Sequence, residues 1–528
     1  MSASLVILDA NIITLNPKQP RATAVAVKNG RIVAVGSDTE IRKHVANGTS
    51  IIDAQNKTVI PGLVDCHVHM AEFGFFLQSP DVKNTRSINE MQQKLREHTS
   101  KTRGKGWVLG GRWDHEKFAE KRYPTRWDLD AAVPDQPVFL VRVCGHIGVA
   151  NTEALRLAGI TKETVVEGGK IDLDEATGQP DGILKENAMR LIWKTVPKPS
   201  LEALEEASML ACNKAVEAGL TGVHWIAESA DEIQAIMNLD SEGKLPLRVY
   251  LGVPPKLLDT RADLHLPTRN SNSKVRFGFV KLFADGSLGS RTAALKQPYS
   301  DEPNSNGLLL HPKDKLCQLV LKAHKAGLQV AVHAIGDRAV ETVLDAYEEA
   351  LKQYPRKDHR HRIEHCSILN PELINRIKAL GLIASVQPHF FVSDFWLIDR
   401  VGTQRARWAF PFRTLVNHGV VVASGSDCPV ESISPLLGVW AAVAKRGSPE
   451  NLTPMQALET YTLNAAYAGF DEDEKGTIEV GKLADFTVLS NDLFNVEPDM
   501  IRNIMVEMTI VDGKVVYARE DSSGVCAR

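Results

Sequence analysis

Short apolar segments alternate with amphipathic ones through most of the chain, and this pattern predicts alternating strands and helices. Eight apolar segments are rich in β-branched residues and typical of buried strands; they cover 59–66, 221–227, 248–253, 275–284, 328–335, 361–368, 382–390 and 420–427. Helical spacing predicts helices near 231–241, 314–326, 337–353, 371–380 and 403–418. Eight strand–helix units in series predict an α/β fold, a parallel (β/α)8 barrel of the TIM type, with functional groups at the carboxyl ends of its strands.

The two ends of the chain have a different pattern, in which short strands follow one another without helices. These strands are predicted at 5–10, 24–28, 31–35 and 50–53, and again at 476–481, 485–489, 505–510 and 514–517. Asn29-Gly30 and Asp512-Gly513 predict tight hairpin turns. Because either small sheet alone would be marginally stable with unpaired edges, we expect residues 1–60 and 476–528 to form one composite β-sandwich domain.

The segment 72–200 interrupts the alternation of strands and helices within the barrel domain, 61–475. It is too long for a loop between a strand and a helix, which usually has two to six residues. At the top of a barrel such an insertion is well placed to cover a substrate. It also contains aromatic and hydrogen-bonding side chains: Trp107, Trp113, Tyr123, Trp127, His146, Asn151 and Trp193. Among these, Trp113 is a candidate substrate-binding residue.

Six polar side chains fall at the predicted carboxyl ends of five barrel strands. They are His67, His69, Lys281, His333, His365 and Asp427. His67 and His69 are two residues apart, so on a strand both imidazoles point to the same face. Imidazole and carboxylate groups bind divalent first-row metals, most often zinc. The gathering of all six at one rim predicts a metal site.

Each candidate also has a purely structural interpretation. The histidines could be hydrogen-bonded core residues, Lys281 an ion-pair partner and Asp427 the cap of a helix. Lys281 needs a further argument, because an ammonium group is not a metal ligand. Burial beside cations lowers the pKa of the amine and frees it to react with carbon dioxide, and the resulting carbamate could bridge two metal ions. An unmodified Lys281 in a one-metal site remains the alternative.

Composition and charge narrow the class of partner. The net charge of −3 gives no basic surface for nucleic acid, and no run approaches the roughly 18 apolar residues that span a membrane. Seven scattered cysteines favour a reducing compartment, and the first residues lack the pattern of a secretory signal. We therefore expect a cytoplasmic protein with a small-molecule substrate and no nucleic-acid or membrane partner. A homodimer is compatible with the sequence.

Four motifs, together with the order of the six candidate ligands, resemble the amidohydrolase superfamily. They are Val280–Ala293 (VKLFADGSLGSRTA), Thr177–Gly182 (TGQPDG), Ser424–Val430 (SGSDCPV) and Gly481–Asp485 (GKLAD). They resemble in particular the amidohydrolase 3 branch, the group of YtcJ-like proteins and N-substituted formamide deformylases. The resemblance covers nearly the whole chain and is specific for fold and reaction class, but it says little about substrate.

The resemblance implies a site with two metal ions, zinc first, with manganese or iron as alternatives. His67, His69 and Asp427 would hold one ion, His333 and His365 the other, and carboxylated Lys281 would bridge them. A hydroxide between the metals would attack the substrate. Asp427 would act as the catalytic acid–base, accepting the proton of this nucleophile and delivering it to the leaving amine.

Three further residues are candidates for substrate binding. His146 resembles a family position that faces the substrate, with a structural histidine as the alternative. His389 ends the predicted strand 382–390 and could hydrogen-bond the substrate or an oxyanion. Arg291 could bind a carboxylate, although a structural ion pair is the competing interpretation. His224, on the second strand, is expected to support the site from behind.

The sequence thus predicts a metal-dependent hydrolase of a non-peptide C–N bond, such as that of an amide or an N-substituted formamide, in a small molecule. The same site could instead hydrolyse an ester or lactone, or deaminate its substrate. A third hypothesis is a catalytically silent barrel that serves as a scaffold, and the presence of all six candidate ligands disfavours it.

Overall fold

The computed structural model describes residues 2–101, 106–142, 147–166, 169–258, 273–445 and 447–520. The chain divides into two compact units, one formed by Met1–Phe73 with Leu204–Arg528 and the other by Gly74–Ala203. The second unit has nearly the limits expected for the insertion, 72–200. Its role in covering a substrate remains a prediction.

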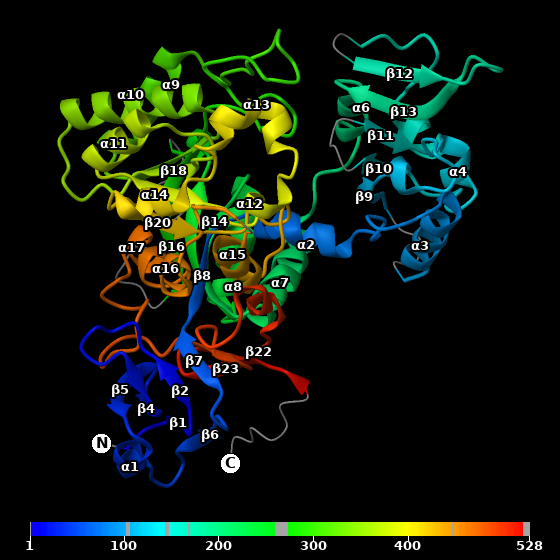
Figure 1. The fold of residues 1–528 in the computed structure, drawn as a ribbon. Coiled ribbons are helices and arrows are strands. Elements are labelled where there is room, and N and C mark those ends of the chain that lie inside the picture. The colour runs from blue at the N-terminus through cyan, green and yellow to red at the C-terminus, as the bar shows by residue number, and fades with distance from the viewer. Residues whose placement is uncertain are drawn as a thin grey trace. The chain divides into compact units, whose positions relative to one another are not determined.

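Eight parallel strands form the barrel of the first unit (Figure 1). In the order of their pairing they are β8 (Leu63–Val68), β14 (Leu220–Ile226), β15 (Arg248–Val253), β16 (Val275–Phe283), β17 (Gln329–Ala334), β18 (Arg362–His365), β19 (Ile383–Val386) and β20 (Val421–Ser424). A parallel bridge joins Val68, at the end of β8, to Cys428, which follows β20. The sheet is therefore nearly closed, which confirms the predicted fold. Continuous burial along β8 and β14 is typical of parallel strands covered on both faces.

The strand expected at 59–66 is in fact two strands. Thr58–Pro61 forms β7 in the β-sandwich, whereas Leu63–Val68 forms β8 in the barrel. Gly62 separates them, and a Cβ atom there would lie 2.2 Å from Oγ1 of Thr221, so only glycine allows β8 and β14 to come so close. This short segment connects the barrel directly to the sandwich.

Helices follow most barrel strands and cover the outside of the barrel. They are α7 (Leu201–Glu217), α8 (Ala230–Ser241), α9 (Lys313–Lys325), α10 (Asp337–Gln353), α11 (Pro371–Ala379), α12 (Phe390–Ser393), α13 (Leu397–Ala406), α14 (Phe412–Asn417), α15 (Pro435–Ala444), α16 (Pro454–Thr460) and α17 (Leu463–Ala468). The single helix expected at 403–418 is wrong, because α13 ends at Ala406 and α14 begins at Phe412. Pro411 lies between them, and a proline there cannot donate the backbone hydrogen bond of a continuous helix.

The two ends of the chain form two sheets with a common core. One sheet has the order β5-β4-β1-β6 and the other β23-β22-β21-β7-β2-β3. The strands are β1 (Leu5–Leu8), β2 (Asn11–Ile13), β3 (Arg21–Ala22), β4 (Ala24–Lys28), β5 (Arg31–Gly36), β6 (Ser50–Asp53), β7, β21 (Phe486–Leu489), β22 (Val506–Val511) and β23 (Lys514–Ala518). β7 pairs with β21, so the start and the end of the chain share a sheet as expected.

The structure confirms both predicted hairpin turns, but one predicted strand of the sandwich does not form. Asn29, Gly30, Asp512 and Gly513 all have positive φ, the conformation that tight hairpin turns require. Residues 476–481 do not form the expected strand. Gly476 and Gly481 have φ near +95° and interrupt an extended chain, so this segment makes only single backbone bonds to its neighbours.

The second unit has its own sheet and core. Its sheet has the order β12-β13-β11-β10-β9. The strands are β9 (Val108–Trp113), β10 (Val138–Arg142), β11 (Ile147–Ala150), β12 (Gly169–Leu173) and β13 (Pro180–Glu186), with helices α3 (Ile88–Lys101), α4 (Arg126–Asp130), α5 (Thr152–Leu157) and α6 (Met189–Trp193). Met91, Leu95 and Trp113 belong to its buried cluster. Helix α2 (Met70–Gln78) begins in the first unit and ends in the second.

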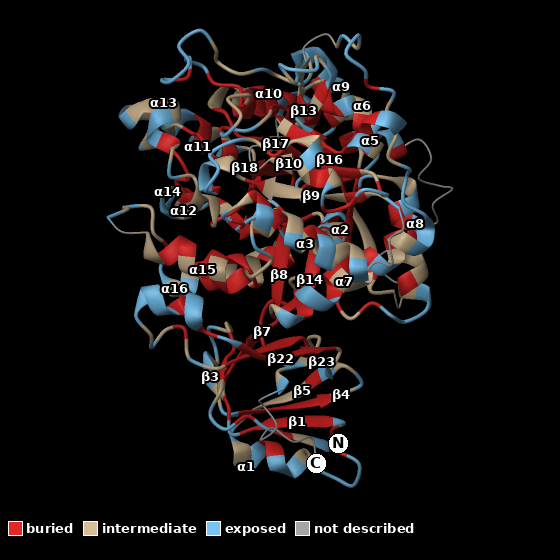
Figure 2. Ribbon diagram, turned by 90° about the vertical axis from the view of Figure 1, so that its right-hand side faces the viewer, coloured by how far each residue is buried: buried red, intermediate tan, exposed pale blue. Residues whose placement is uncertain are grey.

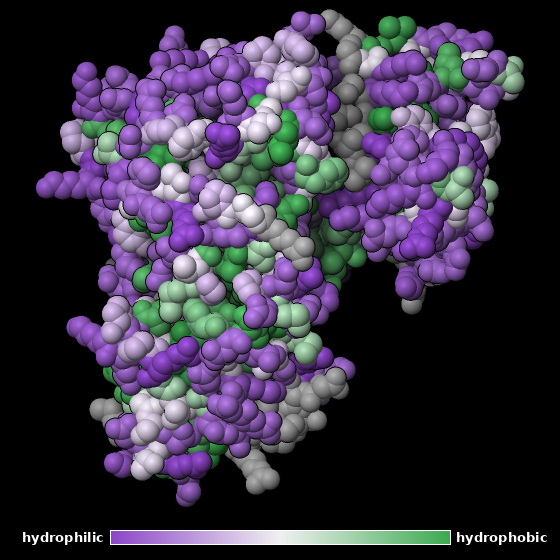
Figure 3. Space-filling view, viewed as in Figure 1, coloured by the Kyte–Doolittle hydropathy of each residue, from purple (hydrophilic) through white to green (hydrophobic). Residues whose placement is uncertain are grey.

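Burial differs among the elements of the first unit. Figure 2 shows β1, β8 and β22 buried, whereas α8 and α16 present exposed faces. Hydrophilic side chains cover most of the face shown in Figure 3, and hydrophobic ones gather around the region of α15. None of the described helices has both the length and the hydropathy to cross a bilayer.

Candidate metal centre

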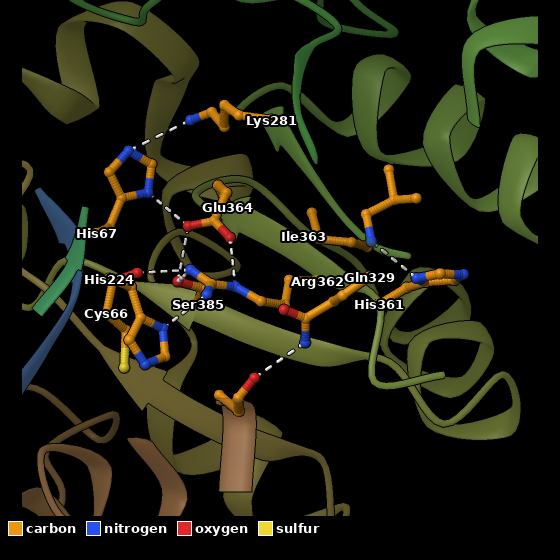
Figure 4. A network of polar contacts seen from close by, with 12 residues as sticks. Cys66, His67, His224, Lys281, Gln329, His361, Arg362, Ile363, Glu364 and Ser385 are labelled. Carbon is orange, nitrogen blue, oxygen red and sulfur yellow. Dashed lines mark hydrogen bonds and ion pairs between the residues drawn. The ribbon is translucent and has the colours of Figure 1, made fainter. Parts of the chain in front are cut away.

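All six predicted ligands lie together at the carboxyl ends of the barrel strands. Nε2 of His67 and Nε2 of His69 lie 3.3 and 3.4 Å from Oδ1 of Asp427. Nζ of Lys281 is 3.3 Å from Nε2 of His67 (Figure 4). The rings of His333 and His365 are 4.4 Å apart between centroids. The fold therefore places at one rim residues that are up to 360 positions apart in the sequence.

Backbone conformation brings two of these residues into the site. His365 ends β18 with φ of 76°, and Asp427 follows β20 with φ of 56°. Residues other than glycine rarely adopt this left-handed conformation, and such residues concentrate at functional sites. Close to them, a Cβ atom on Gly425 would lie 2.5 Å from the backbone nitrogen of His67, so glycine is needed where β20 approaches β8.

Burial and neighbouring charges determine which groups are charged. Burial lowers the pKa of His333 to about 3 and that of His365 well below its usual value, so both imidazoles are neutral at pH 7. Burial disfavours the charge of Asp427, but His67 and His69 hold its pKa well below the usual range. Burial also lowers the pKa of Lys281, to about 8, although Glu364 and Asp427 oppose this.

His69 differs from the other imidazoles. Burial favours its neutral form, but the carboxylates of Asp427 and Glu228 raise its pKa to about 9. Nδ1 of His69 lies 3.6 Å from Oε1 of Glu228. In the absence of a metal, His69 is therefore protonated at neutral pH. A metal ion bound through this ring would have to displace the proton.

The donor set fits a divalent metal ion. Ligand atoms of His67, His365 and Asp427 all lie within 4.8 Å of one another. Nδ1 of His67 bonds to Oε2 of Glu364 at 2.5 Å, and Nδ1 of His365 bonds to Oε1 of Gln387 at 2.6 Å. Each of these rings therefore keeps Nε2 available, as is usual for metal-binding histidines.

This cluster takes one histidine from each of the two ion sites implied by the family resemblance. His333 lies beside it, and its Nε2 donates to the carbonyl oxygen of Gly286 at 3.0 Å, which leaves Nδ1 as the free ring nitrogen. Among the described residues, only this one group has the spacing of a metal site. The number of ions remains a prediction.

The candidate substrate-binding residues have different surroundings. Nδ1 of His389 lies 2.6 Å from Oε2 of Glu431. Arg291 pairs with Asp301 at 2.9 Å, in agreement with the structural interpretation of this residue rather than with carboxylate binding. Trp113 is fully buried in the core of the second unit, where its indole N–H donates to the carbonyl oxygen of Leu140, so it packs in a core instead of facing a substrate. His146 lies outside the described residues.

Sequence reasoning did not identify three polar residues that contact the candidate ligands. Glu364, Gln387 and Glu228 each face the second ring nitrogen of one imidazole. A signal existed for Glu364, because Arg362 and Glu364 are opposite charges two positions apart on a strand that was predicted to be buried. Glu228 closely follows β14, just as the ligands follow or end their own strands. His224 is buried and its Nδ1 accepts from Arg362 at 2.8 Å, which agrees with the supporting position expected for it.

The fold and the site together define a class of protein, the TIM-like barrels with a candidate metal centre at the carboxyl rim of the strands. Comparison with known proteins gives the family. The amidohydrolase family model matches residues 50–517, and the chain belongs to this family of hydrolases. The resemblance noted from the sequence motifs is thereby confirmed.

Three known proteins illustrate the relationship. YtcJ of Bacillus subtilis is 35% identical, over 96% of this chain and 98% of its own length. An N-substituted formamide deformylase of Arthrobacter pascens is 31% identical, over 98% of this chain and 99% of its own. The crystal structure of an uncharacterized metal-dependent hydrolase from Pyrococcus furiosus is 32% identical and covers 93% of this chain and 100% of its own, with a TM-score of 0.80.

Proposed function

We propose that this protein is a metal-dependent hydrolase that cleaves the C–N bond of a small-molecule amide or N-substituted formamide. The observation that carries the proposal is the cluster of His67, His365 and Asp427, whose ligand atoms lie within 4.8 Å of one another. His69, His333 and Lys281 surround this cluster. The similarity to an N-substituted formamide deformylase over nearly the full length of both chains supports the choice of C–N bond.

His67, His69, His333, His365 and Asp427 would hold one or two divalent ions, with zinc the first candidate and manganese or iron the alternatives. When bound, such an ion supplies Lewis acidity and lowers the pKa of water. Asp427 is ionised and lies beside the histidines, with its side chain 14% exposed. Its carboxylate would accept a proton from the attacking water and return it to the nitrogen of the leaving amine.

Lys281 would complete the site as a carbamate. Its amine is buried and has a pKa of about 8, so part of it is neutral at pH 7 to 8. The neutral amine would add to the carbon of carbon dioxide and release one proton. The product has two oxygens and a negative charge where an ammonium group stood. This charge would balance that of a second ion, and it is the reason for favouring two ions over one.

Metal analysis combined with a substrate panel tests the proposal. We would purify the protein without chelator, measure zinc, manganese and iron per chain by elemental mass spectrometry, and assay N-substituted formamides and simple amides. The same panel would contain esters, lactones and aromatic amines open to deamination. We expect one to two metal equivalents, and release of amine from amide or formamide that stops with a chelator and returns with added metal.

The other outcomes separate the competing functions. Turnover of esters or lactones alone, or release of ammonia from the aromatic amines alone, would retain the metal site and refute the assignment to amides. No bound metal and no turnover after metal addition would favour the silent scaffold.

A further inference from the structure

A buried ion pair lies behind the candidate ligands. Arg362 and Glu364 are both fully buried, and Nε of Arg362 lies 2.7 Å from Oε1 of Glu364 (Figure 4). The two residues are two positions apart on β18, so they share its inner face. His365 follows directly, and its positive φ turns this ring inward as well. One short strand therefore supplies both a candidate ligand and a buried carboxylate.

The carboxylate of Glu364 reaches a ligand on a different strand. Its Oε2 accepts from Nδ1 of His67 at 2.5 Å and from Oγ of Ser385 at 2.7 Å. A ring that donates from Nδ1 carries a lone pair on Nε2. Nε2 of His67 is the atom that lies 3.3 Å from both Asp427 and Lys281. Glu364 thus selects the form of His67 that can bind a metal through the nitrogen facing the site.

Arg362 holds this arrangement in place. Its guanidinium donates to the backbone oxygen of Cys66 at 2.6 Å, to Oγ of Ser385 at 3.1 Å and to Nδ1 of His224 at 2.8 Å (Figure 4). Cys66 directly precedes His67, so Arg362 fixes both the carboxylate behind the ring and the backbone from which the ring extends. Its planar group joins β18 to β8, β14 and β19.

We propose that Glu364 is a positioning residue of the metal centre, which fixes the tautomer and orientation of His67, and that Arg362 and Ser385 hold its carboxylate. This inference rests on the proposed function, because it assigns a role toward the same metal. His69 provides an internal contrast. Its carboxylate neighbour Glu228 lies 3.6 Å away with a side chain 61% exposed, so His69 is held far less firmly than His67.

The variant Glu364→Gln tests the role directly. Three donors, from Arg362, His67 and Ser385, converge on the two carboxylate oxygens. An amide offers only one oxygen and turns its own N–H groups toward these donors. We expect the affinity for zinc, measured by chelator competition on the metal-depleted protein, to fall roughly 10–100-fold. We also expect a changed visible absorption spectrum of the cobalt(II) form, because the orientation of one ligand is lost.

Asp485→Asn is the matched control. Asp485 is a buried carboxylate paired with Arg248 at 2.7 Å, and it lies in the loop before β21, outside the metal centre. Loss of a buried ion pair destabilises folding in both variants, so thermal melting of the metal-free proteins measures that shared effect. Only Glu364→Gln is expected to weaken zinc binding and to alter the cobalt spectrum.

Three results would overturn the inference. Zinc affinity of Glu364→Gln within twofold of wild type would do so, as would an equal loss in Asp485→Asn. If Glu364→Gln does not fold, Ser385→Ala takes its place, with Ser208→Ala as the control at a buried serine of α7. Equal affinities in that pair would then refute the role. A wild-type protein that binds no metal would instead refute the proposed function on which the inference stands.

Discussion

The barrel contains two groups of histidines, one at each end of its strands, and they differ in how the ring nitrogens are used. At the carboxyl end, Nδ1 of His67 and Nδ1 of His365 are hydrogen-bonded, and ligand atoms of both rings and of Asp427 lie within 4.8 Å of one another. At the amino end, His361 directly precedes β18, and it lies with His324 and His359 in a second buried group. Both groups have closely spaced imidazoles, so closeness alone does not define a metal site.

Every ring nitrogen of the amino-end group has a hydrogen-bond partner. His361 accepts from the backbone N–H of Val330 at Nδ1 and pairs with Nδ1 of His324 through Nε2, at 3.0 and 2.9 Å. Nε2 of His324 donates to the carbonyl oxygen of Tyr354 at 2.6 Å. Nδ1 of His359 accepts from the backbone N–H of His361, and its Nε2 donates to the carbonyl oxygen of Leu380.

The use of the ring nitrogens distinguishes a candidate metal site from a hydrogen-bonded histidine cluster in the core. The ring nitrogens of the amino-end group are all used in hydrogen bonds within the protein, and the guanidinium of Arg356 contacts Nδ1 of His324. The carboxyl-end rings have their outer nitrogens held by Glu364 and Gln387, which leaves Nε2 free for a metal.

Removal of one ring from each group should lower metal content only at the carboxyl end, and this is the largest effect expected. His67→Ala should lower bound metal per chain and reduce turnover beyond the roughly 10–100-fold typical of residues behind the ligands. His361→Gln should leave both unchanged. Elemental mass spectrometry and turnover on the best substrate would measure this. Unchanged metal in His67→Ala would refute its role as a ligand, and metal loss in a folded His361→Gln would remove the distinction between the groups.

Lys281→Ala tests whether a negative charge belongs among the carboxyl-end rings. The variant should lose most activity, because the proposed bridging carbamate could not form. Formate or acetate, added together with metal, should restore part of it by supplying two oxygens at the vacated position. Turnover measured against the concentration of added acid would detect the rescue. Full activity without any added acid would exclude a bridging carbamate.

Asp427→Asn separates metal binding from proton transfer at the same rim. An amide oxygen can still face His67 and His69, so most of the metal should remain. The amide cannot accept the proton of the attacking water, and loss of such a group lowers turnover by about 10²–10⁴-fold. Metal content and turnover would be measured on the same preparation. Near-normal turnover would exclude Asp427 as the general base.

The sequence predicted the strands well, and the gathering of the ligands follows from them. Parallel strands of a closed barrel bring their carboxyl ends together, so His67 and Asp427 meet although they lie at opposite ends of the barrel sequence. The contact of Glu364 with His67 could not be predicted in this way. Strand alternation puts Glu364 and His365 on opposite faces, and only the positive φ of His365 brings both inside.

The second unit shows a different limit of sequence reasoning. Its aromatic residues suggested a surface that contacts a substrate, but Trp113 is fully buried beside Leu140. An aromatic side chain in an insertion serves a core as readily as a binding surface, and composition does not distinguish the two. In the first unit, Arg291 is a similar case. The sequence alone left carboxylate binding and a structural ion pair open, and its guanidinium pairs with Asp301.

The smallest expected effect is a difference in the pH dependence of folding that arises from the amino-end group. Burial lowers the pKa of His324 and His359, and it lowers that of His361 well below 6.5. Below pH 6.5 the unfolded chain therefore binds protons that the folded chain does not. The stabilisation is complete above pH 6.5 and is lost as the pH falls, by at most about 2 kcal/mol per histidine at pH 5.

Metal-free wild type and His361→Gln should thus differ in the slope of stability against pH. The variant should lose about 1–3 kcal/mol at pH 7, because partners of the ring are left unpaired. It should lose less than wild type on going from pH 7 to pH 5, because one proton-binding group of the unfolded chain is gone. Urea unfolding at both pH values in the presence of a chelator would measure this. The carboxyl-end residues titrate equally in both proteins, so their contribution cancels when the two changes in unfolding free energy are subtracted. Parallel slopes would mean that the amino-end rings already bind a proton in the folded protein. The description of these rings as neutral and fully hydrogen-bonded would then be wrong.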